Sequence, residues 1–361
     1  MTPSRPDARW PDDRFAELLG SSHPILLAPM AGAGGVDLAA GAIAGGAVGS
    51  LPCGMLTPDE MRSQVAELRA RAAGPVNLNF FCHLMPAHSD EGTWRTLLAP
   101  FYERYQVTAG RAEPVRRPFD ASMCQAVETV RPELVSFHFG LPEAALLDRV
   151  RAAGCRVVAT ATTVEEARRL AERGIDGIVA QSWEAGGHAG RFLGGRPDEQ
   201  MGLFALLPQI VDAVPMPVIA AGGIADGRGI AAALILGAAA VQIGTAYLHC
   251  PESLIAPAHR EALASEAAER SVFTNLFSGG LARGLWNEPM AELGPVRAEA
   301  PPFPLATVAL MPLARAAAER GEAGFRPMWA GQAGRLGRPL PARELTEHLA
   351  ADALARIGAN A

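Results

Sequence analysis

Short apolar runs recur along this chain, and amphipathic segments separate them. Segments such as Pro58–Arg71 and Glu165–Arg173 repeat apolar residues at helical spacing, with Glu and Arg between them. The apolar runs do not alternate with polar residues, which is typical of strands buried on both faces. Eight such runs spread over about 250 residues predict an α/β fold, a TIM (β/α)8 barrel. They are Ile25–Ala28, Ala47–Leu51, Val76–Phe81, Leu134–Phe139, Arg156–Ala161, Gly177–Gln181, Val218–Ala221 and Val241–Gly244.

Two regions interrupt this pattern. The connection Met85–Phe119 is long for a barrel, and connections of that length usually cover the active face. After the eighth run the pattern dissolves between Pro251 and Pro304, and helical spacing resumes from Leu305. We therefore predict a barrel at residues 14–250, a small additional lid domain at 251–304, and C-terminal helices at 305–361 that return to the barrel.

Composition excludes several classes of protein. The chain has 361 residues, 49% hydrophobic content and a net charge of −6, without a basic cluster for nucleic acid. It contains no lysine, so a Schiff-base lysine and a P-loop lysine are both excluded. The five cysteines are scattered without a metal-ligand pattern, which indicates reduced thiols. The first residues lack a secretory pattern and the run Ala231–Ala240 is too short for a membrane span, so we expect a cytoplasmic protein.

Glycine-rich turns follow the last two predicted strands. Gly222 and Gly223 come directly after the seventh run, and Gly244 with Thr245 follows the eighth. Glycine lets backbone N–H groups approach a phosphate closely, and barrels build their phosphate sites from the loops after strands seven and eight. Either turn alone is typical of a tight loop, whereas the two together predict a phosphate site. Asp226 is expected to cap the helix that follows.

Two histidines are candidates for the chemistry. His188 lies in the stretch Gln181–Gly190, beyond the sixth strand and flanked by glycines, where a barrel presents catalytic groups. His138 ends the fourth strand and is either a core residue or part of the pocket. Glu184 either orients Nδ1 of His188 or contacts the backbone of the turn. The sequence shows no ligand set for a metal ion.

The first and third strands contribute further candidates. Met30 follows Ala28–Pro29 at the end of the first strand, as a soft surface for a flat ligand or as a packed rim. Asn77 and Asn79 lie on the same side of the third strand, where each amide needs a partner. A heterocyclic ligand or a backbone group would serve equally well.

Taken together, these motifs carry a family resemblance. The segments Ala28–Met30, Asn77–Asn79, Ser136–Gly140, Glu184–His188, Ala220–Ile224 and Gln242–Thr245 resemble those of nitronate monooxygenases, formerly called 2-nitropropane dioxygenases. The resemblance extends to Trp329–Gln332 and is strongest to the bacterial class I branch, because of its Ser–Phe–His–Phe–Gly and Glu–Ala–Gly–Gly–His signatures.

The resemblance implies an FMN-dependent enzyme that oxidises alkyl nitronates with O₂ to a carbonyl compound and nitrite, a detoxifying reaction. His188 as an imidazolium would hold the nitronate, with His138 opposite and with Ser278 and Phe303 in the substrate pocket. The resemblance is also compatible with a homodimer. FMN would contact Met30, Asn79, Gln181, Gly187, Gly222, Gly223, Gly244, Thr245 and Gln332.

Three departures from the family pattern concern the substrate pocket. Gly280 stands where class I members carry arginine, Phe303 stands in place of a tyrosine, and the family's pocket lysine is absent. Losing the tyrosine hydroxyl removes a hydrogen bond of about 0.5–1.5 kcal/mol. The departures favour a substrate that is larger or more apolar than propionate 3-nitronate.

Three other functions fit parts of the pattern. An FMN-dependent NAD(P)H reductase, of the enoyl-ACP or quinone type, shares the barrel and the Gly–His loop, although no nicotinamide site is recognisable here. A flavin-free isomerase or lyase would use the glycine cradle for a substrate phosphate. A non-catalytic binding barrel is disfavoured by His188 at the mouth.

Overall fold

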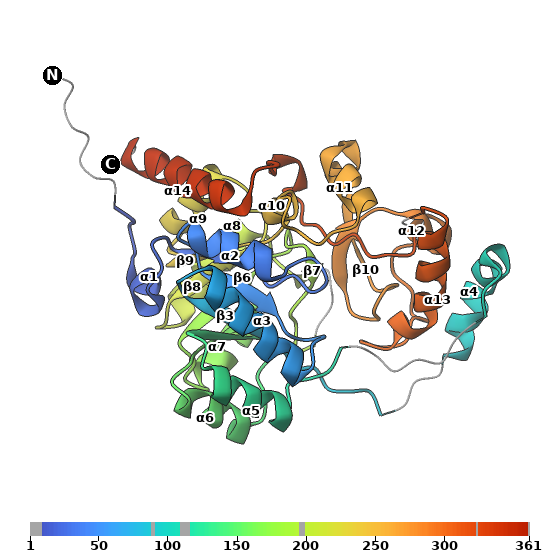
Figure 1. Cartoon of the computed structure of the whole chain (residues 1–361), viewed down its shortest axis with the longest axis horizontal. Helices are drawn as coiled ribbons and strands as arrows, with labels where there is room; N and C mark the ends of the chain where they lie inside the picture. Colours follow the sequence, from blue (N-terminus) through green and yellow to red (C-terminus); the bar gives the residue numbers. More distant parts are fainter. Residues whose placement is uncertain (1–8, 88–90, 109–115, 195–198, 323, 360–361) are drawn as a thin grey trace.

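The computed structural model describes residues 9–87, 91–108, 116–194, 199–322 and 324–359 (Figure 1). Eight parallel strands form one sheet in the order β1-β9-β8-β6-β5-β4-β3-β2. An additional parallel bridge between Leu26 and Val48 joins the two ends of that order, so the sheet closes into a barrel. The predicted fold is therefore confirmed. The strands are β1 (Ile25–Leu27), β2 (Gly49–Pro52), β3 (Val76–Phe81), β4 (Leu134–His138), β5 (Arg156–Ala161), β6 (Gly177–Gln181), β8 (Val218–Ala221) and β9 (Ala240–Ile243).

Side chains of the strands divide between two apolar clusters, as the period of two requires. In β1, Ile25 and Leu27 pack toward the surrounding helices, whereas Leu26 joins an inner cluster with Val158 and Val179. Helix α1 (Arg14–Leu19) adds Phe15 to this inner cluster. Several of its other members lie at or just before strand starts, so α1 packs at the amino ends of the strands and leaves the carboxyl ends for a site.

Amphipathic helices surround the barrel, and polar caps begin several of them. Thr57 and Glu60 form a reciprocal capping box on α3, and Asp120 and Thr163 cap α5 and α7. Asp226 accepts from two N–H groups at the start of α9, which confirms its predicted role. The outer helices are α2 (Val36–Ala44), α3 (Pro58–Arg71), α5 (Ala121–Val130), α6 (Ala144–Ala152), α7 (Val164–Ala171), α8 (Leu203–Ala213), α9 (Gly227–Ile235) and α14 (Ala342–Ala359).

A second layer lies beside the barrel mouth (Figure 1). Its sheet has the order β10-β11-β7, and its apolar cluster joins α4 to α13, with Trp94 and Phe101 packed among residues 276–325. Within the C-terminal region, α13 thus packs in the second layer, whereas α14 packs on α2 and α9 of the barrel. The boundaries at residues 251 and 305 stay predictions. The elements are α4 (Gly92–Tyr105), β7 (Gly187–His188), α10 (Thr245–Leu248), α11 (Pro257–Ala264), η2 (Glu266–Glu269), β10 (Ser271–Thr274), β11 (Ala282–Leu285), α12 (Glu288–Leu293), α13 (Ala306–Glu319) and η3 (Gly334–Leu336).

The close contact between α2 and α14 should reverse the usual effect of a Gly→Ala substitution on the free energy of unfolding. In an ordinary helix, Gly→Ala stabilises by about 1 kcal/mol. At Gly41, however, a Cβ atom would lie 2.7 Å from Cβ of Ala342, so we expect Gly41→Ala to lower the free energy of unfolding by roughly 1–3 kcal/mol in urea titrations. Ala44→Gly, at an exposed position of the same helix, controls for helix propensity. A more stable Gly41→Ala variant would show that α14 does not pack tightly on α2.

Candidate active site

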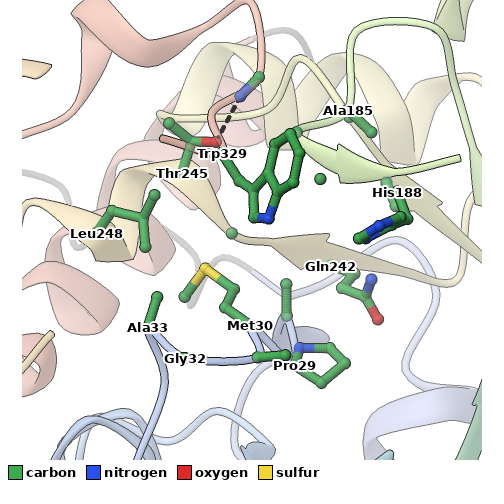
Figure 2. Close-up of a pocket in the computed structure, with 18 of the residues that line it drawn as sticks. Pro29, Met30, Gly32, Ala33, Ala185, His188, Gln242, Thr245, Leu248 and Trp329 are labelled. Carbon is green, nitrogen blue, oxygen red and sulfur yellow. Dashed lines mark hydrogen bonds between the residues drawn. The ribbon is translucent and has the colours of Figure 1, made fainter. Parts of the chain in front are cut away.

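A cavity of about 400 Å³ lies at the carboxyl ends of the barrel strands. Loops after β1, β6, β8 and β9 line it together with the segment 326–333 (Figure 2). The cavity brings together ten of the residues singled out from the sequence. These are Met30, Asn79, His138, Gln181, Gly187, His188, Gly222, Gly223, Gly244 and Thr245.

The loops after β8 and β9 present unpaired backbone donors. Within the described part of the chain, the N–H groups of Gly222, Gly223 and Gly244 donate to no protein acceptor. Gly222 has φ 110°, and a Cβ atom there would lie 2.3 Å from Oγ of Ser182. Thr245 Oγ1 accepts from the N–H of Gly331 at 2.9 Å, which leaves the hydroxyl proton to donate (Figure 2). The residues present therefore fit a phosphate group.

Met30 and the strand amides border the same cavity. A Cβ atom at Gly244 would lie 3.5 Å from Sδ of Met30, so this thioether packs beneath the β9 turn. Asn79 Nδ2 donates to the hydroxyl and carbonyl oxygens of Ser136, and Asn77 donates to Oγ of Ser50. Asn79 therefore takes a backbone partner, one of the two alternatives that the sequence left open, together with a serine hydroxyl. Asn77 takes a side-chain hydroxyl, which was neither alternative.

Two barrel side chains hold the backbone of His188. Gln181 donates from Nε2 to the His188 carbonyl at 2.9 Å and accepts from the N–H of Gly190 at 2.7 Å. His138 Nε2 also lies 3.1 Å from that carbonyl, while its Nδ1 lies 3.1 Å from Oγ1 of Thr160. Since a carbonyl only accepts, Nε2 of His138 carries the proton and Nδ1 accepts from the threonine. Burial lowers the pKa of His138 to about 4, so it is neutral at pH 7.

The His188 ring is enclosed by aromatic side chains. Its Nε2 lies 2.8 Å from Oγ of Ser278, and its centroid lies 5.1 Å from Phe303 and 5.4 Å from Trp329. Desolvation lowers the pKa of His188 well below its usual range, and the charge of Arg116 and the nearby His138 and His83 add to this. The imidazolium expected from the sequence is therefore disfavoured here, because the ring is desolvated beside a permanent cation.

Several expected residues lie elsewhere. Gln332 does not line the cavity: it is exposed, and its N–H donates to the carbonyl of Glu184 at 3.0 Å. Phe303 and Ser278 contact the His188 ring rather than the cavity itself. The Glu184 carboxylate accepts from the N–H of Leu203 at the start of α8, so the backbone alternative is the one observed.

The cavity also contains residues that the sequence interpretation missed. Trp329 projects into it beside His188 (Figure 2), and Thr160 and Arg116 line it as well. His83 packs edge-on against Phe303 at 4.7 Å, next to the cavity. Trp329 lies in a segment already associated with the resemblance, whereas no sequence signal distinguishes Arg116 or His83 from ordinary loop residues.

Two further absences concern metal and membrane. Among the residues with assigned positions, no three His, Cys, Asp or Glu side chains gather as a metal ion would require. None of the helices in these ranges combines the length and apolar character needed to cross a bilayer. All five cysteines are free thiols, and four of them are buried.

The fold and the cavity define an enzyme of the phosphate-binding barrel class. The barrel is closed, its last two strands end in glycine turns that fit a phosphate, and a histidine lies at its mouth. A family model described as nitronate monooxygenase matches residues 13–352. The chain belongs to the nitronate monooxygenase family, as the sequence motifs predict.

Individual relatives agree with this assignment. The nitronate monooxygenase of Paraburkholderia phytofirmans is 44% identical over 92% of both chains, and that of Pseudomonas aeruginosa is 40% identical over 93% of this chain and 98% of its own. Nitroalkane oxidase from Streptomyces ansochromogenes is structurally similar, with TM-score 0.88 and 36% identity over 96% of this chain and 99% of its own. FabK from Thermotoga maritima follows at TM-score 0.75 and 26% identity, over 98% of both chains.

Proposed function

We propose that this protein binds FMN and oxidises alkyl nitronates with O₂ to a carbonyl compound and nitrite. The observation that carries the proposal is one cavity that joins unpaired N–H groups at Gly222, Gly223 and Gly244 to the ring of His188. When bound, FMN would supply the redox chemistry, taking electrons from the nitronate and passing them to O₂. The glycine N–H groups and the Thr245 hydroxyl would hold its phosphate, and Met30, Asn79, Gln181 and Gly187 would border its rings.

His188 would orient the nitronate through a defined proton. Ser278 Oγ lies 2.8 Å from Nε2 and 3.4 Å from the Gly280 carbonyl, and the shorter contact favours Nε2 as the acceptor of the hydroxyl proton, which would leave the ring proton on Nδ1. Within the described residues, the ring of His188 has its one hydrogen bond at Nε2, so Nδ1 can donate to a nitronate oxygen. A substrate anion beside the ring would also raise the pKa of His188 from its lowered value, because opposite charges favour the protonated form. His138 and Gln181 act by positioning this loop.

A reductase is the second candidate function. FabK-like reductases are more distant from this chain in both sequence and structure than nitroalkane oxidase is. The two functions differ in the electron donor, because a reductase requires NADH or NADPH. A cytoplasmic location and a homodimer belong to the proposal as further predictions.

Anaerobic mixing separates these functions. We expect purified protein to show flavin absorbance, and excess propyl-1-nitronate to reduce that absorbance before O₂ restores it with release of nitrite. NADH and NADPH are expected to leave the absorbance unchanged under the same conditions. Colourless protein would refute the FMN assignment, and rapid loss of absorbance with NADH but not with nitronate would favour the reductase.

A further inference from the structure

Arg116 is a buried cation that pairs with no carboxylate among the residues the structure describes. Its side chain is 9% exposed and lines the cavity. Its one hydrogen bond among the described residues runs from Nη1 to Oγ1 of Thr307 at 3.3 Å, and Nε is buried without a partner. A desolvated guanidinium that lacks an anion is costly, so its position calls for a counter-ion from outside the chain.

The other buried arginine near the cavity shows the contrast. Arg283 is 2% exposed, donates to the carbonyls of Trp183 and Ser271, and stacks over Phe273 at 4.3 Å. Its donors are used within the protein, and it ties the β6 loop to β10. Arg116 does not link two elements in this way. Among the described residues, its side chain makes a single long hydrogen bond, to the neutral hydroxyl of Thr307.

Backbone contacts hold Arg116 at the cavity. Pro118 bridges to Phe81, the N–H of Phe119 donates to the Phe81 carbonyl at 2.7 Å, and the N–H of Arg117 donates to the Gly54 carbonyl at 3.3 Å. The residue is therefore anchored alongside the end of β3. Its charge lowers the pKa of both His83 and His188, which means that it faces the same part of the pocket as the candidate catalytic ring.

Aromatic rings cluster around His83 and His188, the two histidines that the charge of Arg116 reaches. Phe139, which adopts a left-handed φ of 66°, packs 5.0 Å from Phe303 and 6.1 Å from His188. A Cβ atom at Gly280 would lie only 3.0 Å from the Phe303 ring and 3.3 Å from His188, so Phe303 fills the space beside that position. Beside this apolar packing, the buried guanidinium of Arg116 at the cavity suits an anion that carries an alkyl group.

We propose that Arg116 binds the anionic group of the substrate and makes this pocket select ionised alkyl nitronates over neutral nitroalkanes of the same carbon skeleton. The proposal rests on the proposed nitronate oxidation. The nitronate oxygens would supply the counter-ion that Arg116 lacks, with the alkyl chain against Phe81, the cavity-lining ring that packs on Phe139 and Phe303. Arginine stays charged throughout the working pH range, so this attraction does not depend on the protonation of His188.

The test compares Arg116→Gln with the neighbouring variant Arg117→Gln, which removes an exposed arginine one residue away. For Arg116→Gln, we expect KM for propyl-1-nitronate to rise on the order of 100-fold, with a smaller change in kcat and no selectivity over 1-nitropropane. Arg116→Lys should recover part of the loss. Butanoate, whose planar carboxylate matches the nitronate, provides a readout independent of turnover.

Thermal unfolding with butanoate completes the experiment. Butanoate should raise the Tm of the wild-type protein and of Arg117→Gln but not that of Arg116→Gln, whose Tm without butanoate should be equal or higher. The proposal would be overturned if Arg116→Gln kept the wild-type KM and the stabilisation by butanoate. It would also be overturned if Arg116→Gln had a lower Tm than the wild type but was still stabilised by butanoate. If wild-type protein fails to oxidise nitronates but shows Arg116-dependent protection, the proposed function fails and the anion site stands.

Discussion

Protein carrying Gly222→Val is expected to purify with less than a tenth of the flavin bound by the wild type. A Cβ atom at this position would lie 2.3 Å from Oγ of Ser182 and 2.9 Å from the backbone nitrogen of Ala185, and φ is 110°. The turn must therefore change its path, because L side chains rarely adopt this conformation and the contact with the backbone nitrogen of Ala185 cannot be relieved by a side-chain rotation. The displaced turn would no longer aim its N–H groups at a phosphate. The ratio of flavin to protein absorbance measures the effect.

Gly154→Val is the matched control for this variant. Gly154 also has a positive φ, 88°, but no atom lies within 4 Å of a Cβ atom there, and the turn before β5 lies at the opposite end of the barrel from the cradle. Its strain should cost roughly 1–3 kcal/mol of stability and leave flavin content unchanged. Stoichiometric flavin in Gly222→Val would mean that the phosphate is held elsewhere.

His188→Ala is expected to retain flavin and to lose about 10²–10⁴-fold in nitronate turnover, the range typical of a lost proton-handling group. The His188 ring is the proposed hydrogen-bond donor to the nitronate, whereas Gln181 and His138 hold the backbone of its loop. Removing the ring should therefore leave the loop and the cradle in place. Steady-state nitrite release and the flavin spectrum measure the two effects. Wild-type turnover in His188→Ala would contradict the assigned role.

The pH profile provides a second test of His188. Desolvation, together with Arg116, His138 and His83, lowers its pKa in the folded protein, so the ring stays neutral as pH falls through 6.5. With nitronate preformed and mixed within seconds, kcat/KM should stay flat from pH 8 through 6.5 and change only at lower pH. A kcat/KM that rises as pH falls through 6.5 would instead show that free protein must first gain a proton at this histidine.

Local sequence signals predicted the barrel and the cradle because both follow from short-range rules. Apolar runs buried on two faces match eight observed strands, with differences of one or two residues at their ends. The turn at Gly222 needs glycine because of its own backbone, with φ 110°, and the positions of Gly222 and Gly244 directly after two consecutive strands revealed the cradle. His188 stood out in the same way, since its glycine neighbours leave few packing reasons for a ring.

Long-range packing was not predictable in the same way. Arg116 and Arg117 are adjacent and chemically identical, and only the chain path beside β3 decides that the first is buried and the second exposed. Helix α13 was expected to return to the barrel, but its apolar face meets α4, more than 200 residues earlier in the chain. The protonation state of His188 likewise depends on Arg116, His138 and His83, neighbours from three separate segments that no spacing in the sequence encodes.

The pairing of β7 with β11 has a mechanical consequence. His188 belongs to β7, so its ring is attached to the three-stranded sheet of the second layer, while its carbonyl is clamped by barrel side chains. If that sheet moved relative to the barrel, His188 would lose either its pairing with β11 or the hydrogen bonds to its carbonyl. We therefore expect the second layer to keep its position beside the barrel while substrate binds, because His188 is held by both.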